Sequence, residues 1–159
     1  MAAGASAPEV VVLVGLQASG KTTFYAQRFA STHAHVSRDR FRNATRPAQR
    51  QRRLVGEALA AGRPVVVDNT NPTVADRAAI LEVARRLGVP ASCYFFPPRV
   101  RESIGRNARR EGRERVPVVG ILATAKRLVP PTRAEGFDRL FEVEPGEGGA
   151  FVIREVEPG

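Results

Sequence analysis

Eight residues near the start of the chain match a pattern that binds phosphate. Residues 15–22 read GLQASGKT, which fits G-x-x-x-x-G-K-[S/T]. Gly15 and Gly20 let the backbone bend so that its N–H groups point inward around a phosphate. In this pattern Lys21 reaches the β- and γ-phosphates of a nucleotide, and the Thr22 hydroxyl holds Mg²⁺. The spacing therefore predicts a nucleotide-binding loop rather than a glycine-rich turn with one surface lysine.

The segments on either side of this loop are those that such a site needs. Residues 10–14 are apolar and mostly β-branched, which predicts a buried parallel strand. Residues 22–30 predict a helix with Phe24 and Phe29 facing inward, and Tyr25 as a further candidate. The N-terminus of that helix adds partial positive charge beside the phosphate. We expect ATP to contact Gly15, Ala18, Ser19, Gly20, Lys21, Thr22 and Thr23.

A carboxylate follows the next predicted strand, residues 35–37. Asp39 stands among Arg38, Arg40 and Arg42. Phosphoryl transfer to a hydroxyl needs a carboxylate that orients the hydroxyl and accepts its proton. Asp39 is therefore a candidate general base, and the alternative is a helix-capping or salt-bridged side chain. Arg42 is either a clamp for a phosphate of the acceptor or the partner of an acidic neighbour.

A second carboxylate, Asp68, ends the apolar run of residues 64–68. A carboxylate at the end of a strand is typical of a group that acts on Mg²⁺ or its waters. Asn69, Thr70 and Asn71 follow and offer neutral donors to phosphate or sugar oxygens. The alternative is a polar turn whose side chains satisfy their own backbone. We favour the first interpretation, in which Asp68 joins the hydroxyl of the phosphate loop at the metal.

Arginines crowd residues 106–115 with almost no apolar side chain among them. Guanidinium groups stabilise the negative charge that spreads over phosphoryl oxygens during transfer. A mobile segment that carries them over the nucleotide would also exclude water. Because Gly112 interrupts the stretch and residues 109–115 lack apolar anchors, we favour a lid over about residues 106–116 rather than a solvated helix face.

Strands and helices alternate along most of the chain. This order predicts an α/β fold, a P-loop NTPase-type, mostly parallel sheet with helices on both faces and two antiparallel C-terminal strands. Ligands of such sheets bind at the carboxyl ends of the strands, which gathers the phosphate loop, Asp39 and Asp68 at one edge. The strands are expected over residues 10–14, 35–37, 64–68, 90–96, 140–144 and 151–156, and Thr45 is the expected cap of the second helix.

The length and composition predict one domain. The 159 residues contain 43% hydrophobic and 26% charged side chains, and we expect a single kinase domain over residues 9–159 after a disordered lead-in over residues 1–8. No apolar run is long enough to span a membrane, and no secretory signal is visible. The single cysteine, Cys93, lies in an apolar run and is expected in the core. A cytoplasmic location is the expectation.

The charge points to a polyanionic partner. Lysine and arginine exceed aspartate and glutamate by 25 to 16, a formal net charge of +9. Such a surplus favours nucleic acid or highly phosphorylated small molecules. The alternative is an arginine-rich protein with an ordinary solvated surface.

These motifs together resemble the kinase domain of the polynucleotide 5′-hydroxyl kinases, known from phage and animal polynucleotide kinase/phosphatases. The combination of DNTNP at residues 68–72 and AEGF at residues 134–137 is more specific than the phosphate loop. The matching stretches keep the family's order over nearly the whole chain, at residues 15–22, 37–42, 67–72, 106–110, 116–117 and 131–137.

On the donor side, the resemblance implies that Lys21 and Thr22 bind the ATP phosphates and Mg²⁺. Arg110 would be the lid arginine on the donor phosphates, and Arg106 would also bind the nucleotide. Thr22 and Asp68 are then the expected metal residues.

On the acceptor side, the resemblance implies that Asp39 is the general base for a 5′-hydroxyl and that Arg42 contacts a phosphate of the acceptor. Asp68, Asn69 and Thr70 would line the acceptor pocket.

We therefore expect an ATP- and Mg²⁺-dependent kinase of the 5′-hydroxyl end of DNA or RNA, active in nucleic-acid repair. Its expected catalytic residues are Lys21, Asp39 and Arg110. One alternative is the same chemistry on a nucleoside, sugar or antibiotic. Another is a nucleotide-binding adaptor without transferase activity. The sequence indicates neither a partner protein nor an oligomeric state.

Overall fold

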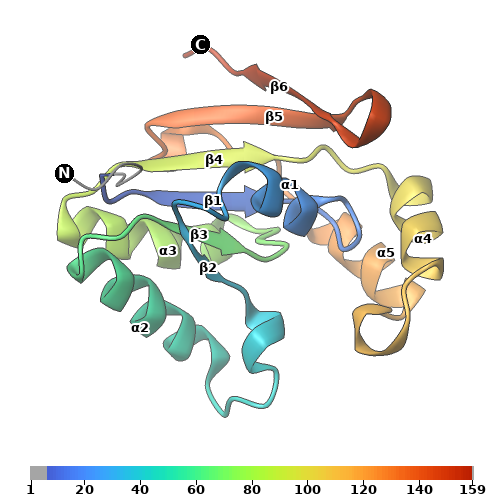
Figure 1. The fold of residues 1–159 in the computed structure, drawn as a ribbon, viewed down its shortest axis with the longest axis horizontal. Helices are drawn as coiled ribbons and strands as arrows, with labels where there is room; N and C mark the ends of the chain where they lie inside the picture. Colours follow the sequence, from blue (N-terminus) through green and yellow to red (C-terminus); the bar gives the residue numbers. More distant parts are fainter. Residues whose placement is uncertain (1–6, 159) are drawn as a thin grey trace.

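The computed structural model describes residues 7–158, which form one sheet with helices around it (Figure 1). Of the lead-in expected over residues 1–8, residues 1–6 lie outside the described residues. Ala7 and Pro8 precede the first strand without regular secondary structure.

The sheet has six strands in the order β2-β3-β1-β4-β5-β6. Neighbours from β2 to β5 run parallel, and β6 runs antiparallel to β5. The predicted mostly parallel sheet is confirmed. The C-terminal hairpin is also confirmed, although its first strand continues the parallel part of the sheet and only the second reverses. The strands are β1 Val10–Val14, β2 Ala34–Val36, β3 Val65–Asp68, β4 Ala91–Phe95, β5 Arg139–Pro145 and β6 Phe151–Glu155.

The helices provide the crossovers that parallel strands require. They are α1 Lys21–Arg28, α2 Pro47–Ala60, α3 Val74–Leu87, α4 Val100–Ala108 and α5 Val118–Arg127. Short 3-10 turns occur at η1 Arg38–Phe41, η2 Gly112–Glu114, η3 Arg133–Glu135 and η4 Glu147–Gly149. Among the described residues, no helix has both the length and the apolar composition needed to cross a bilayer.

Alternating side chains of the strands build a separate core on each face of the sheet. On one face Val10, Val12 and Val14 pack with buried residues of α2 and α3. On the other face Val11 and Leu13 pack with α1 and with the β5–β6 hairpin. Figure 1 shows α4 and α5 beyond the carboxyl ends of the strands rather than over either face. The two cores fix the sheet, and α4 and α5 are left to border the edge where ligands bind.

The ends of α3 follow the sequence signals, whereas the start of α2 does not. Thr73 caps α3 in a capping box with Asp76, and Gly88 ends the helix in the left-handed conformation. Thr45 was the expected cap of α2, and this prediction is wrong. The capping position is Arg46, which makes no side-chain cap bond, because Pro47 itself occupies the first helical position.

Candidate functional site

The phosphate loop joins the end of β1 to the start of α1. Ala18 and Gly20 both have positive φ angles, 58° and 97°, which turn the backbone around the loop. Gly20 stands at the N-cap of α1 and supplies no side-chain cap, so a ligand can take the first N–H groups of the helix. A side chain at Gly15 has no room, since its Cβ would lie 2.8 Å from the Phe96 Cβ. The loop therefore has the backbone shape of an anion cradle.

Lys21 folds back onto its own loop. Its Nζ donates to the carbonyl oxygens of Gly15 (3.1 Å) and Leu16 (2.7 Å). Burial lowers the pKa of Lys21 to about 8. The charge of Arg110 lowers this pKa further, whereas the charges of Asp68 and Asp39 raise it. Three predicted site residues thus act on one ammonium group, although they come from β3, from η1 and from the segment after α4.

Thr22 and Asp68 meet at the carboxyl end of β3. The Thr22 hydroxyl donates to Asp68 Oδ2 at 2.8 Å, and His35 Nε2 lies 2.8 Å from the same oxygen. Burial alone would raise the pKa of Asp68, but the hydrogen bond with His35, the charge of Lys21 and the hydrogen bond from Thr22 together hold it below its usual value. Asp68 is therefore an anion, and the structure brings the expected metal pair together.

The oxygen donors of this pair suit Mg²⁺. Magnesium usually keeps several waters and takes only one or two protein oxygens beside the substrate phosphates. A hydroxyl and an ionised carboxylate, placed beside the phosphate loop, fit that requirement. Within residues 7–158 no group of three or more His, Cys, Asp or Glu side chains is placed to hold a metal by itself.

Asp39 and Arg42 lie together on the solvent side of the site. Asp39 is in η1, whose first turn is capped by the Ser37 side chain. Arg42 Nη2 is 3.5 Å from Asp39 Oδ1, and the Asp39 side chain is 80% exposed. An exposed pair at this distance is worth little energy, so both groups are available to a ligand.

The loop after β3 joins the phosphate loop to η1 and α2. Asn69 Oδ1 accepts from the Arg38 backbone N–H at 2.9 Å, and Asn69 Nδ2 donates to Gln51 at 2.7 Å. The Gly15 N–H donates to the Thr70 carbonyl at 3.1 Å. Asn69 and Thr70, the expected pocket residues, thus also have structural contacts. These contacts connect the phosphate loop, η1 and α2 to the loop after β3.

A buried ion pair contacts the loop after β3. Arg77 is fully buried and donates to both carboxylate oxygens of Glu135, at 2.8 and 3.1 Å. It also donates to the Asn71 carbonyl at 3.0 Å, while Asn71 Nδ2 donates to the Leu13 carbonyl at 2.8 Å. Asn71 has a positive φ of 45°, which these contacts stabilise. The conformation after β3 therefore depends on Glu135, far along the chain.

The segment expected as a lid leaves the end of α4 and returns at the start of α5. The Asn107 side chain joins its two ends, donating to the Val116 carbonyl at 2.7 Å and accepting from the Val116 N–H at 2.9 Å. Arg110 lies between them and donates to the Glu114 carbonyl at 3.2 Å. The segment is thus a loop closed at its base, with Arg110 near enough to Lys21 to lower its pKa.

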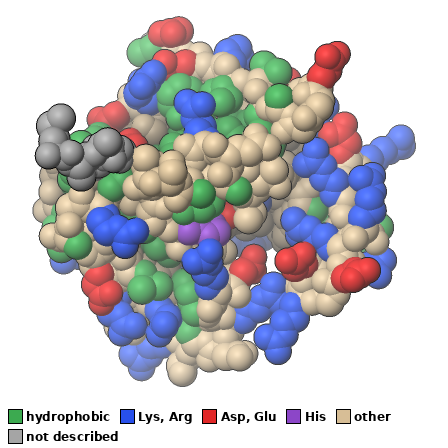
Figure 2. Space-filling view, in the orientation of Figure 1, with side chains coloured by type: hydrophobic (Ala, Val, Ile, Leu, Met, Phe, Trp, Pro, Cys, Tyr) green, Lys and Arg blue, Asp and Glu red, His purple; other side chains and the backbone are tan. Residues whose placement is uncertain are grey.

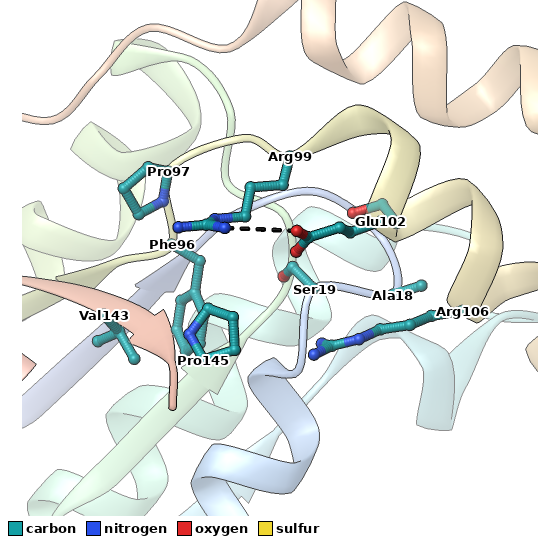
Figure 3. Close-up of a pocket in the computed structure, with 10 residues that line it drawn as sticks. Ala18, Ser19, Phe96, Pro97, Arg99, Glu102, Arg106, Val143 and Pro145 are labelled. Carbon is teal, nitrogen blue, oxygen red and sulfur yellow. Dashed lines mark hydrogen bonds and ion pairs between the residues drawn. The ribbon is translucent and has the colours of Figure 1, made fainter. Parts of the chain in front are cut away.

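A small pocket lies between the phosphate loop, α4 and the end of β5 (Figure 3). Figure 3 shows Arg106 extending toward the loop, and its Nη1 lies 3.1 Å from where a Cβ on Gly20 would stand. Across the pocket, Arg99 pairs with Glu102 at 3.3 Å. The pocket offers apolar walls and a cationic rim beside the cradle. Its lining residues are Ala18, Ser19, Phe96, Pro97, Arg99, Glu102, Ser103, Arg106, Val143 and Pro145.

Several residues of the site escaped the sequence reasoning. His35 and Gln51 join predicted residues through contacts that require knowing which strands and helices are neighbours. The burial of Arg77 could have been predicted from the sequence, because it lies on the same face of its helix as the apolar Ile80, Leu81 and Ala84. All four residues are buried.

Basic side chains flank a hollow on the face of the molecule shown in Figure 2. Figure 2 shows Lys and Arg gathered on both sides of it, over η1–α2 and over the α4–α5 region, with a few acidic side chains between. Such a surface attracts anions to the carboxyl edge of the sheet.

Comparison with known structures identifies this fold. The chain is similar to a gluconokinase from Sinorhizobium meliloti 1021, at 21% identity and a TM-score of 0.62, over 86% of this chain and 82% of that one. It is also similar to a chain of the Pnkp1/Rnl/Hen1 complex, at 24% identity and a TM-score of 0.55, over 63% of this chain and 39% of that one. These likenesses show the fold alone, a P-loop NTPase-type, mostly parallel sheet.

Sequence comparison confirms the resemblance drawn from the motifs. The chain is 27% identical over 139 residues to the bifunctional polynucleotide phosphatase/kinase of Schizosaccharomyces pombe (strain 972). The match covers 85% of this chain but 33% of the relative, so the chain spans about a third of that protein's length. The family described as AAA domain matches residues 10–129. Because this match spans well over half of the sequence, the chain belongs to the AAA domain family.

Proposed function

We propose that this chain transfers the γ-phosphate of ATP to the 5′-hydroxyl end of DNA or RNA. The observation that carries the proposal is the exposed Asp39–Arg42 pair beside the phosphate loop. Both groups are free to receive an acceptor, and Asp39 is close enough to act on the charge of Lys21. The similarity to a polynucleotide phosphatase/kinase supports the choice of acceptor.

The donor side is formed by the phosphate loop and its cation. In the proposed reaction Lys21 exchanges its contacts with the Gly15 and Leu16 carbonyls for the β- and γ-phosphate oxygens of ATP. Thr22 and Asp68 would hold Mg²⁺, which neutralises charge on the phosphates when bound.

The acceptor side is formed by η1. Asp39 accepts the proton of the 5′-hydroxyl while that oxygen bonds to the γ-phosphorus. The bond from phosphorus to the β–γ bridging oxygen breaks, and ADP leaves with the bonding electrons. Arg42 holds the phosphate that follows the first nucleoside of the acceptor, which places the hydroxyl in line with the donor.

Residues 106–116 would close over the donor. Arg106 already extends toward the phosphate loop (Figure 3), and Arg110 lies close enough to Lys21 to affect its pKa. On closure Arg110 would contact the transferred group and balance its charge.

We also propose that residues 9–159 act as one kinase domain and that this domain takes part in nucleic-acid repair in the cytoplasm.

The test is transfer of label from γ-labelled ATP, in the presence of Mg²⁺, to an oligonucleotide with a 5′-hydroxyl. We expect label with the natural protein and a loss of about 10²- to 10⁴-fold in kcat for Asp39→Asn, with ATP affinity retained. Glu82→Gln, which changes an exposed carboxylate on α3, is the matched control and should remain active.

The same assay separates the alternatives. If ATP binds but no oligonucleotide is labelled, the proposed acceptor is wrong, and a panel of nucleosides and sugars tests the small-molecule kinase. If no hydroxyl compound stimulates formation of ADP, the chain is a nucleotide-binding adaptor.

A further inference from the structure

Most of the net charge of the chain is concentrated beside Asp39. Residues 38–53 contain seven arginines and a single acidic residue, Asp39 itself, which gives +6 of the formal +9. Surfaces of soluble proteins usually mix both signs, because like charges repel one another in the folded state. A cluster this one-sided therefore costs stability unless an anion offsets it.

Three of these arginines form one row along α2. Arg46, the N-cap of α2, and Arg50 and Arg53 within it are spaced i, i+4 and i+7; by helical geometry this spacing places their positions within about 60° of arc on one side of the helix. All three are exposed. With a rise of about 1.5 Å per residue, the row extends roughly 10 Å along the helix axis. We call these three residues the α2 arginine row.

The row has almost no acidic partner within the chain. Arg46 and Arg50 make no ion pair with the described residues, and Arg53 has a loose, exposed pair with Glu57 at 3.7 Å. The Arg50 guanidinium lies over the ring of Phe41, 5.7 Å from its centre, and Phe41 is the last residue of η1. The row is therefore continuous with the turn that carries Asp39.

We propose that the α2 arginine row binds the sugar-phosphate backbone of the acceptor strand beyond the phosphate held by Arg42. The inference rests on the proposed function and deepens it, because it makes the acceptor a polynucleotide rather than a mononucleotide. Along the axis of a stacked strand the phosphates advance by about 3.4 Å each, so a row of roughly 10 Å that lies along this axis reaches about three of them. A small phosphorylated acceptor would end at Arg42 and leave the row unused.

The surroundings of the row favour nucleic acid over an anionic membrane. The large exposed apolar side chains among the described residues lie elsewhere, on α3, on α5 and after it, and on β6. A membrane-binding helix needs such side chains next to its basic ones. Contacts from arginine to phosphate carry no base information, so binding should depend on strand length and salt but not on sequence.

The experiment measures binding of a 3′-fluorescent, 5′-hydroxyl 12-mer DNA without ATP, over a range of salt. The test variant is R46Q/R50Q/R53Q. The control variant is R63Q/R85Q/R86Q, which replaces three exposed arginines near the amino ends of the strands. Single strands contribute about 0.7 to the salt slope per phosphate contact, so the test variant should flatten log Kd against log salt by about 2. Its Kd should also rise tenfold or more, and the control should keep the natural slope.

Two further comparisons make the result decisive. R46K/R50K/R53K keeps the charges and should keep the slope, and matching circular dichroism spectra establish that each variant is folded. Equal losses in the test and control variants, or no loss in either, would overturn the proposal. Phosphorylation of a nucleoside 3′-monophosphate by the natural protein tests the proposed function separately. If that activity is absent, the binding slopes still decide whether the row holds a strand.

Discussion

Replacing Lys21 by methionine should make the folded protein more stable while removing the cation that we propose for catalysis. Burial lowers the pKa of Lys21 from 10.5 to about 8. At about 1.4 kcal/mol per pH unit, this lowering corresponds to roughly 3 kcal/mol, which the folded state loses by keeping the ammonium charged at neutral pH. Methionine avoids this loss but leaves two loop carbonyls without a donor, at about 1 kcal/mol each.

The dependence on pH isolates the charge from these lost hydrogen bonds. Below pH 8 Lys21 is protonated in both states and the folded state bears the full penalty. Between pH 8 and 10.5 the unfolded chain binds a proton that the folded chain has lost, so the free energy of unfolding rises with pH. The natural protein should therefore gain roughly 2–3 kcal/mol in free energy of unfolding relative to Lys21→Met between pH 7 and pH 10.

Urea unfolding at pH 7 and pH 10 measures this difference. Burial raises the pKa of Tyr25 and Tyr94, so these two groups lower the stability of the folded state as the pH approaches 10. Both proteins contain them, so this background cancels in the difference between the natural protein and Lys21→Met. Lys126→Met, at an exposed lysine, is the control and should show no such change. A stability difference between the natural protein and Lys21→Met that stays constant from pH 7 to pH 10 would refute a buried, depressed Lys21.

Three other changes test the support of the site. Glu135→Gln leaves the Arg77 guanidinium buried without its carboxylate, so the free energy of unfolding in urea should fall by about 3–5 kcal/mol, and an unchanged value would contradict a buried pair. Gly15→Ala places a Cβ 2.8 Å from the Cβ of the buried Phe96, so the loop must move: calorimetry should show at least tenfold weaker ATP binding, urea unfolding should show lower stability, and normal affinity would show that the loop has space. Asn107→Ala opens the base of the lid by removing two hydrogen bonds, so the KM for ATP should rise several-fold; an unchanged KM would separate the lid from the donor site.

The sequence predicts those parts of the site that depend on neighbours along the chain. Gly15, Gly20 and Lys21 define the loop by spacing alone, and the end of an apolar strand marks Asp68. The rule that ligands bind at the carboxyl ends of parallel strands then brings Thr22 and Asp68 together, and the structure places them 2.8 Å apart.

Contacts between distant elements are what the sequence could not supply. His35 contacts Asp68 because β2 lies next to β3 in the sheet. The sequence of neither strand predicts that the two are neighbours. The prediction for the start of α2 was wrong for a local reason. A threonine at the capping position and a proline at the first helical position both favour a helix start, and only the backbone conformation shows which residue is the cap. The roles proposed for Asp39, Arg42 and Arg110 stay predictions that the labelling assay tests.

The backbone hydrogen bond from the Gly15 N–H to the Thr70 carbonyl joins the phosphate loop to the loop that carries the residues we propose for the acceptor. Nucleotide binding that shifts the phosphate loop must also shift the strand end beside the acceptor. Linkage makes the effect reciprocal, so whatever factor ATP applies to acceptor affinity, the acceptor applies to ATP affinity. The Asn71 contact to the Leu13 carbonyl ties the same segment to β1, which limits how far either loop moves alone. We therefore predict that the proposed donor and acceptor bind cooperatively through the main chain, and that no side-chain substitution at the surface abolishes this coupling.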